Sequence, residues 1–227
     1  RSSLCLNCSS PKKRRRLVLV GGGHAHAQVI KALNKYSRPA DVDVILIDPQ
    51  VSASYSGMVP ACVAGIYEHE ETLLHIKPIA EAVGLQFRNT AVVTIDPIGQ
   101  VLTLQDGTIC EYDVVSFDIG SVTKDADTVP GVKTNAIPTR PISGLVKRIQ
   151  GVEKSLPKDA IHVVVVGGGS AGVELAFAIK ARWSPLCTSV KVTILDRSST
   201  LLSMESEECR RAVQKSLQER DITIVQN

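Results

Sequence analysis

The chain has 227 residues, of which 44% are hydrophobic, enough for one large buried core or two smaller ones. Its formal net charge of +3 is misleading, because residues 1–16 hold six basic side chains and no acid. The remaining residues keep 20 of the 26 basic groups against 23 acidic ones, a net charge of −3. This charge balance excludes a nucleic-acid-binding body.

The basic end, "RSSLCLNCSSPKKRRR" (residues 1–16), is predicted to be a disordered tail. It is rich in Ser and Arg and lacks acids, as transit peptides do, which weakly suggests a plastid or a mitochondrion. Without such an address the protein would be cytoplasmic. The Lys-Arg run could also be a nuclear localisation signal or a phosphate-binding tail, but such short runs are more often solvated tails. We expect no transmembrane segment, because no apolar run reaches about 20 residues.

The first apolar run leads directly into three glycines, in "RRRLVLVGGGHAHAQVIKAL" (14–33). The expected elements are a strand, a helix and a second strand, over 17–20, 24–35 and 42–47. Gly21 and Gly23 stand in the register of a G-x-G-x-x-G turn, and Asp48 ends the second strand. His26 replaces the third glycine of that motif.

The third glycine governs how closely the helix packs on the strand, so this helix should sit slightly farther out or lean. The two glycines that serve the turn and the approach of a phosphate are kept. A metal site at His24 and His26 would lack a third ligand nearby in the sequence, and we predict none. The alternative is that His24 lies in the first helical turn while His26 packs against the sheet.

The middle of the chain is less regular. Residues 48–87 contain turn signals and short helical pieces. Residues 90–121 contain short β-rich runs separated by turn residues, which predicts an antiparallel meander. A linker over 129–141 and an amphipathic helix over 143–155 follow.

A second glycine-rich junction occurs in "HVVVVGGGSAGVELAFAI" (162–179). Gly167, Gly169 and Gly172 match G-x-G-x-x-G between a strand and a helix, which predicts a dinucleotide site. The expected elements are strands over 161–166, 190–195 and 222–225 and helices over 170–182 and 206–219. Asp196, at the end of the second of these strands, is suited to a ribose 2′-hydroxyl. It favours NADH, although the adjacent Arg197 could soften that preference.

These patterns predict an α/β fold with tandem Rossmann-like domains, parallel sheets and an antiparallel β-meander. The expected division is a tail over 1–16, a first domain over 17–141 and a second domain over 142–227. The second domain looks truncated after its first half, because nothing follows its last strand.

Four segments carry a resemblance to a known family: "LVGGGHAH", "YSGMVPACVAGIY", "YDVVSFDIGS" and "VVVVGGGSAGVE". In that order they resemble the pyridine nucleotide–disulfide oxidoreductase superfamily, over residues 17–227. Within it the chain looks most like type II NADH dehydrogenases, and closer still like the oxidoreductase modules fused to selenophosphate synthetases.

The resemblance implies that the first domain is the first part of an FAD-binding domain and the second the first half of an NAD(P)H-binding domain. Residues implied for FAD are Gly21, Gly23, His24, Asp48, Tyr55, Met58, Pro60, Val92, Gly120 and Ser121. Those implied for NAD(P)H are Gly167, Gly169, Gly172, Glu174 and Asp196, with Glu174 near the nicotinamide as the catalytic candidate.

The implied function is hydride transfer from NAD(P)H to FAD, with electrons passing on to a quinone or another small acceptor. The redox cysteine motifs of related enzymes are missing, and Cys62 is interpreted as a packing residue. The alternative is a nucleotide-binding, redox-sensing or regulatory module coupled to a partner such as a selenophosphate synthetase. A homodimer formed through a missing C-terminal part is also an expectation from the family.

Overall fold

The computed structural model describes residues 14–36, 39–123 and 128–227. The chain divides into two compact units. Of the described residues, unit 1 comprises 14–36, 39–53 and 74–120, and unit 2 comprises 54–73, 121–123 and 128–227. Each unit has its own sheet and its own core.

The compact units do not divide at the predicted boundary after residue 141. Residues 54–73 and 121–141 group with the second half of the chain. The division falls within β3 (Ala53–Ser54) and β4 (Leu73–Leu74), two short strands that pair with each other. Residues 54–73 group with unit 2 because the helix α2 (Val59–Val63) within them packs on helices of that unit.

The predicted basic tail falls mostly on residues 1–13, which lie outside the described residues. Its last residues belong to β1 (Arg15–Val20), so the first strand begins two residues earlier than predicted. Arg16 pairs in parallel with Asp43, and the Nη2 atom of Arg14 lies 3.1 Å from Oδ1 of Asp43. The basic residues at the start of β1 therefore lie beside acidic residues near the start of β2.

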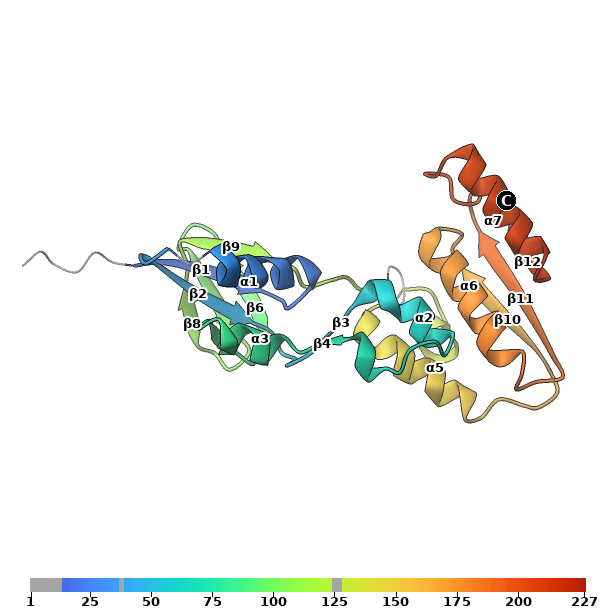
Figure 1. Ribbon diagram of the computed structural model, residues 1–227, viewed down its shortest axis with the longest axis horizontal. Helices are drawn as coiled ribbons and strands as arrows, with labels where there is room; N and C mark the ends of the chain where they lie inside the picture. Colours follow the sequence, from blue (N-terminus) through green and yellow to red (C-terminus); the bar gives the residue numbers. More distant parts are fainter. Residues whose placement is uncertain (1–13, 37–38, 124–127) are drawn as a thin grey trace, which may run out of the picture. The chain divides into compact units, whose positions relative to one another are not determined.

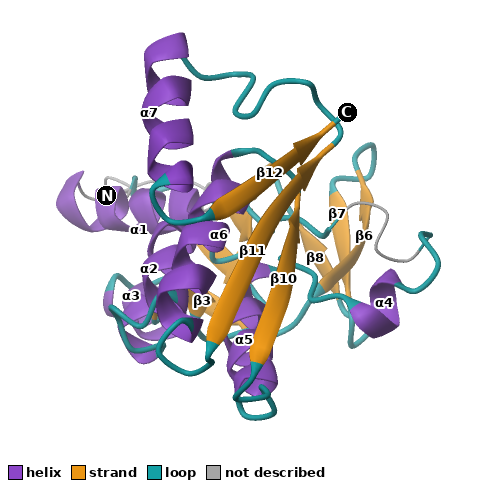
Figure 2. Cartoon of the chain, turned by 90° about the vertical axis from the view of Figure 1, so that its right-hand side faces the viewer, coloured by secondary structure: helices purple, strands orange, loops and turns teal. Residues whose placement is uncertain are grey.

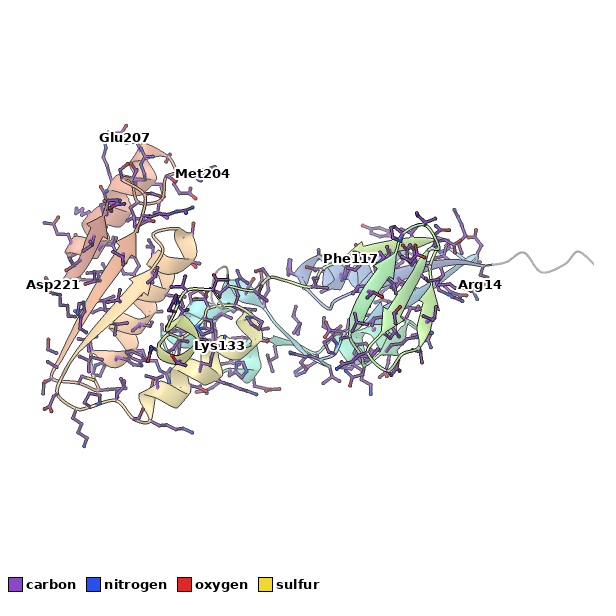
Figure 3. All side chains as sticks on the ribbon, turned by 180° about the vertical axis from the view of Figure 1, so that it is seen from behind. Arg14, Phe117, Lys133, Met204, Glu207 and Asp221 are labelled. Atoms are coloured by element: carbon purple, nitrogen blue, oxygen red, sulfur yellow. The ribbon has the colours of Figure 1, made fainter. Side chains whose placement is uncertain are left out.

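Unit 1 is built on a four-stranded parallel sheet in the order β5–β2–β1–β9 (Figure 1). The other three strands are β2 (Val42–Ile47), β5 (Gln86–Arg88) and β9 (Val114–Phe117). The carboxyl ends of these parallel strands meet at one edge of the sheet. Figure 3 shows Arg14, just before β1, and Phe117, the last residue of β9, at opposite ends of this unit.

The sheet of unit 1 is covered on both faces. On one face, Leu19 of β1 clusters with residues of α1 (His24–Tyr36) and α3 (Ile76–Ala82). On the other, Val18 and Val20 cluster with an antiparallel meander. The meander strands are β6 (Val92–Asp96), β7 (Val101–Leu104) and β8 (Ile109–Glu111). Burial on both faces explains the apolar runs of the central strands, from Leu17 in β1 and from Val44 in β2.

Unit 2 is built on a three-stranded parallel sheet in the order β10–β11–β12 (Figure 2). Its elements in chain order are β10 (Ala160–Val166), α6 (Ser170–Trp183), β11 (Ser189–Asp196), α7 (Glu207–Gln218) and β12 (Ile222–Gln226). They match the predicted second βαβ unit to within a residue or two at each end. The predicted α/β class, with parallel sheets and an antiparallel meander, is confirmed.

Two further helices are α2 (Val59–Val63) and α5 (Leu145–Glu153), and α2 packs on both α5 and α6. They share with α6 and β11 one buried cluster that includes Val59, Leu145 and Trp183. The predicted linker contains a short helix, α4 (Val132–Asn135), at a left-handed Gly131. The 3₁₀ turns are η1 (Ser56–Met58), η2 (Glu70–Thr72) and η3 (Ile142–Gly144). No helix in the described part of the chain is long and apolar enough to cross a membrane.

A half-buried ion pair links α5 to α6. Arg182 donates two hydrogen bonds to the carboxylate of Glu153, and Trp183 Nε1 donates a third at 3.1 Å. The hydrogen bond from Arg182, more than the one from Trp183, holds the pKa of Glu153 below its usual 4.5 although burial opposes this. A lowered carboxyl pKa stabilises the folded state above the usual pKa, and this stabilisation is lost as the pH falls through the lowered value.

We therefore expect Glu153→Gln to lower the free energy of unfolding of unit 2 by about 1–2 kcal/mol at pH 7. The difference should shrink towards zero as the pH falls below the pKa range of Glu153. The fluorescence of Trp183, the single tryptophan of the chain, follows urea unfolding of this unit. Glu207→Gln is the matched control, because its Arg211 partner is 73% exposed and such pairs contribute little. Equal losses in the two variants would contradict the prediction.

Candidate functional sites

The first candidate site is the turn between β1 and α1. Gly21 has φ +92°, in the left-handed region, and its N–H donates to Ile47 O at 2.8 Å. A Cβ at this position would lie 2.2 Å from the backbone oxygen of Asp118. The turn therefore needs glycine here for its backbone conformation and for its close packing against the strand that follows the meander.

Asp48 lies at this turn, as predicted. It follows β2, and its Oδ2 accepts a hydrogen bond of 2.6 Å from the N–H of Gly22. Its Oδ1 accepts another, also of 2.6 Å, from the N–H of Gln50. The carboxylate is thus fixed at the carboxyl end of a parallel strand beside a glycine turn, where a Rossmann-type acid binds a ribose hydroxyl.

His26 fills the place of the third glycine with a buried, doubly hydrogen-bonded imidazole. The side chain is 2% exposed, and its Nδ1 lies 2.6 Å from Gly21 O. A carbonyl oxygen only accepts, so Nδ1 carries the proton. Nε2, 2.9 Å from Oγ of Ser116 on β9, can then accept from the hydroxyl group. The expectation that His26 packs against the sheet is confirmed.

These contacts also bear on the rejected metal reading of His24 and His26. Both ring nitrogens of His26 already have protein partners. Within residues 14–36, 39–123 and 128–227, no group of three or more His, Cys, Asp or Glu side chains is arranged to hold a metal ion.

Asp118, which the sequence reasoning missed, also lies at this turn. Its N–H donates to Val20 O at 2.8 Å, and its Oδ2 accepts from the backbone N–H of His26 at 3.2 Å. A Cβ on Gly23 would lie 2.4 Å from its carboxylate atoms. A polar residue just after a parallel strand, at the edge where ligands bind, was the signal that could have identified it.

The second candidate site is the turn between β10 and α6. Gly167 has φ +110°, and its N–H donates to Leu195 O at 2.8 Å. A Cβ on Gly172 would lie 1.9 Å from Gly167 O, so the helix begins in direct contact with the turn. This is the close helix–strand packing that the third glycine of the motif provides.

Asp196 and Gly169 complete the second site. The Oδ2 of Asp196 would lie 2.4 Å from a Cβ on Gly168, so its carboxylate rests on the middle glycine. Gly169 is exposed, and a Cβ there would meet no atom within 4 Å. The backbone at the second glycine and the first turn of α6 are therefore open to an anionic group, which fits a dinucleotide pyrophosphate.

The two junctions differ in the room that they leave at the third position of the motif. At the first, a whole imidazole fits between α1 and the Gly21 carbonyl. At the second, a single Cβ on Gly172 would clash with the corresponding carbonyl of Gly167. The first junction therefore leaves room for a side chain at the third position of the motif, and the second does not.

The structure brings only some of the predicted FAD residues together. Gly21, Gly23, His24 and Asp48 lie at the first turn. In the same unit, Val92 begins β6 and Gly120, with φ +71°, follows β9. The other four, Tyr55, Met58, Pro60 and Ser121, belong to unit 2. Met58 precedes α2, and Pro60 lies in the first turn of that helix.

The predicted nicotinamide residue Glu174 is exposed on α6. Gly167, Gly169, Gly172 and Asp196 lie together at the second turn.

Cys62, on α2, is a packing residue, as predicted. It is 3% exposed and lies in the same buried cluster as Trp183. Burial raises the pKa of its thiol, although the positive charge of Arg182 partly offsets this effect. A buried thiol with a raised pKa is a poor nucleophile, so this cysteine lacks the exposure and the lowered pKa of a reactive one.

Two glycine-rich β–turn–α junctions, each with a carboxylate from the neighbouring strand, define a protein with two dinucleotide-binding folds. The chain belongs to the pyridine nucleotide-disulphide oxidoreductase family, whose model matches residues 15–227.

The relatives that the chain matches include proteins named as NADH or NAD(P)H oxidoreductases. The chain is 27% identical to the NADH dehydrogenase-like protein YutJ of Bacillus subtilis, over 93% of this chain and 57% of that protein. It is also 27% identical to the alternative NAD(P)H-ubiquinone oxidoreductase C1 of Arabidopsis thaliana, over 94% and 44%. The chain spans about half the length of the curated relatives it matches.

Among solved structures, the fold is similar to that of NDH2 from Plasmodium falciparum in complex with NADH. The TM-score is 0.73 at 16% identity, and the match covers 94% of this chain and 48% of that one.

Proposed function

We propose that the chain forms the FAD-binding and NAD(P)H-binding parts of an oxidoreductase that delivers electrons to a quinone or another small acceptor. The observation that carries the proposal is the pair of glycine junctions, each with a hydrogen-bonded or closely packed carboxylate at the end of the next strand. Bound FAD would supply the redox chemistry, namely acceptance of a hydride from the nicotinamide and transfer of electrons to the acceptor. The residues of this chain would bind the two dinucleotides and orient them.

At the second junction, Gly167 shapes the turn, Gly169 leaves room for the pyrophosphate, and Gly172 brings the helix close enough to direct its first N–H groups at the phosphates. Asp196 would accept a hydrogen bond from the adenosine ribose. Its negative charge would repel a 2′-phosphate, which favours NADH over NADPH, with Arg197 beside it as an opposing charge. Glu174 is proposed to lie near the nicotinamide.

At the first junction, Gly21, Gly23 and His24 would face the FAD pyrophosphate and Asp48 its ribose. The assignment of FAD to the first site and NAD(P)H to the second follows the family, because the glycines alone do not distinguish the two dinucleotides. The proposed quinone acceptor is supported by the names of relatives, among them the type II NADH:quinone oxidoreductase of Staphylococcus aureus, 22% identical over 92% of this chain. An organelle location and a selenophosphate synthetase partner remain predictions.

The test is an anaerobic visible spectrum of the purified chain mixed with FAD and freed of unbound flavin. NADH and NADPH are then added to separate samples. We expect bound yellow flavin that bleaches with NADH and more slowly with NADPH. A quinone analogue should then restore the colour.

Each failure identifies a different part of the proposal. Flavin that stays bound but never bleaches would contradict the oxidoreductase function and support a regulatory module. Absence of bound flavin, measured alongside normal NADH binding, would contradict the assignment of the first junction to FAD.

A further inference from the structure

The two junctions differ at the glycine that the phosphate must approach. Gly23 and Gly169 occupy the same position of the motif. A Cβ on Gly169 would meet nothing within 4 Å, whereas a Cβ on Gly23 would lie 2.4 Å from the Cγ, Oδ1 and Oδ2 atoms of Asp118. The second site is open at this point, and the first is covered by a carboxylate.

The Asp118 carboxylate is held at this place by the fold. Asp118 directly follows β9, whose last residue, Phe117, pairs with Val20 at the end of β1. Its backbone N–H is fixed on Val20 O, and its Oδ2 accepts from the N–H of His26. That N–H is in the first turn of α1, where the helix has no internal acceptor for it and where negative charge is favoured.

A dinucleotide pyrophosphate would need the same position. In a glycine-rich β–α turn, the phosphates approach the second glycine and accept hydrogen bonds from N–H groups of the first helical turn. At the first junction both features already serve an anion that belongs to the chain. A phosphate at this N–H would lie against the Asp118 carboxylate, and their like charges repel.

We propose that the Asp118 carboxylate occupies the phosphate position of the first junction in the free protein and leaves it when the dinucleotide binds. Asp118 is therefore an affinity-determining residue, because its carboxylate lowers the affinity of this site for the dinucleotide. Among the described residues, the second junction has no such carboxylate near Gly169. The proposal rests on the proposed function, because it takes FAD as the dinucleotide.

The substitution Asp118→Asn tests the proposal. The amide oxygen can still accept from the N–H of His26, but the negative charge is gone. FAD affinity, measured by isothermal titration with the full chain, should rise about tenfold, the effect of removing one like-charge contact. The affinity for inorganic pyrophosphate should rise in the same direction.

Asp113→Asn is the matched control. Asp113 also lies in unit 1 and accepts a backbone hydrogen bond, from the N–H of Arg16 at 2.6 Å, but it precedes β9 and so lies at its other end. This variant changes the net charge equally and should leave the affinity for FAD unchanged. Urea unfolding of both variants separates effects on binding from effects on folding.

Each outcome decides the question. Tighter FAD binding by Asp118→Asn alone, or FAD binding by this variant where the original chain shows none, supports the proposal. If the original chain binds FAD and Asp118→Asn binds it equally or more weakly, the proposal is overturned while the proposed function stands. If neither protein binds FAD, both the proposal and the FAD assignment are overturned.

Discussion

Replacing Gly172 with alanine is expected to destabilise unit 2 by about 3 kcal/mol or more. The added Cβ would lie 1.9 Å from Gly167 O and 3.1 Å from Gly167 C, which are backbone atoms of the turn. Neither atom can rotate away as a flexible side chain could. Relief requires α6 to shift along β10, and α6 contributes Val173, Ala176 and Trp183 to the buried cluster of this unit.

Gly169→Ala is the matched control within the same turn. Gly169 has φ −79° and ψ 177°, an extended conformation that alanine adopts without strain, and its Cβ would meet no atom within 4 Å. We expect urea unfolding, followed by Trp183 fluorescence, to give a stability close to that of the original chain. NADH affinity should nevertheless fall about tenfold or more, since the methyl group would stand at the proposed pyrophosphate position.

The two glycines therefore separate folding from binding. Loss of stability in Gly172→Ala with unchanged stability in Gly169→Ala would confirm the packing argument. Full NADH affinity in a folded Gly169→Ala would contradict the assignment of this turn to a nicotinamide dinucleotide.

The two βαβ units could be predicted from the sequence because local patterns determine them. The strand predicted over 42–47 has those bounds, and the helix predicted over 24–35 ends at Tyr36. Buried parallel strands are continuous apolar runs, and a glycine turn marks the start of each first helix. The carboxylates of Asp48 and Asp196 were predictable for the same reason, since each lies at the end of the second strand of its βαβ unit.

The compact units could not be predicted in this way. The segment 54–73 contains two-residue strands and single helical turns, which have no hydrophobic period of their own. Its membership of unit 2 follows from packing of α2 on α6, more than 100 residues later in the chain. Local propensity carries no signal for such a contact.

Asp118 was missed for a related reason. It was within the quoted segment "YDVVSFDIGS", but its importance follows from contact with His26, 92 residues earlier. The sequence analysis assigned the phosphate position to Gly21, Gly23 and His24. The structure adds that strand order brings the end of β9 beside β1, so that residues after β9 reach the same turn.

His26→Ala is expected to destabilise unit 1 by about 2–4 kcal/mol. The substitution removes a buried imidazole and leaves a void between α1 and the sheet. It also leaves Gly21 O and the Ser116 hydroxyl without the partners that now lie at 2.6 and 2.9 Å. Restoring the family glycine, His26→Gly, should be no better, because the spacing of α1 is set by the side chain that fills it.

Hydrogen exchange measured by mass spectrometry on peptides covering β1 and α1 reports this loss within unit 1. Trp183 fluorescence, which follows unit 2, should be unchanged. Ser116→Ala gives the graded comparison: it removes one hydrogen bond and keeps the one to Gly21, so its effect should be about 1 kcal/mol. If the amides of β1 and α1 exchange as slowly in His26→Ala as in the original chain, the imidazole is not what joins the helix to the glycine turn. An effect of Ser116→Ala as large as that of His26→Ala would instead place the whole stabilisation in the bond to β9.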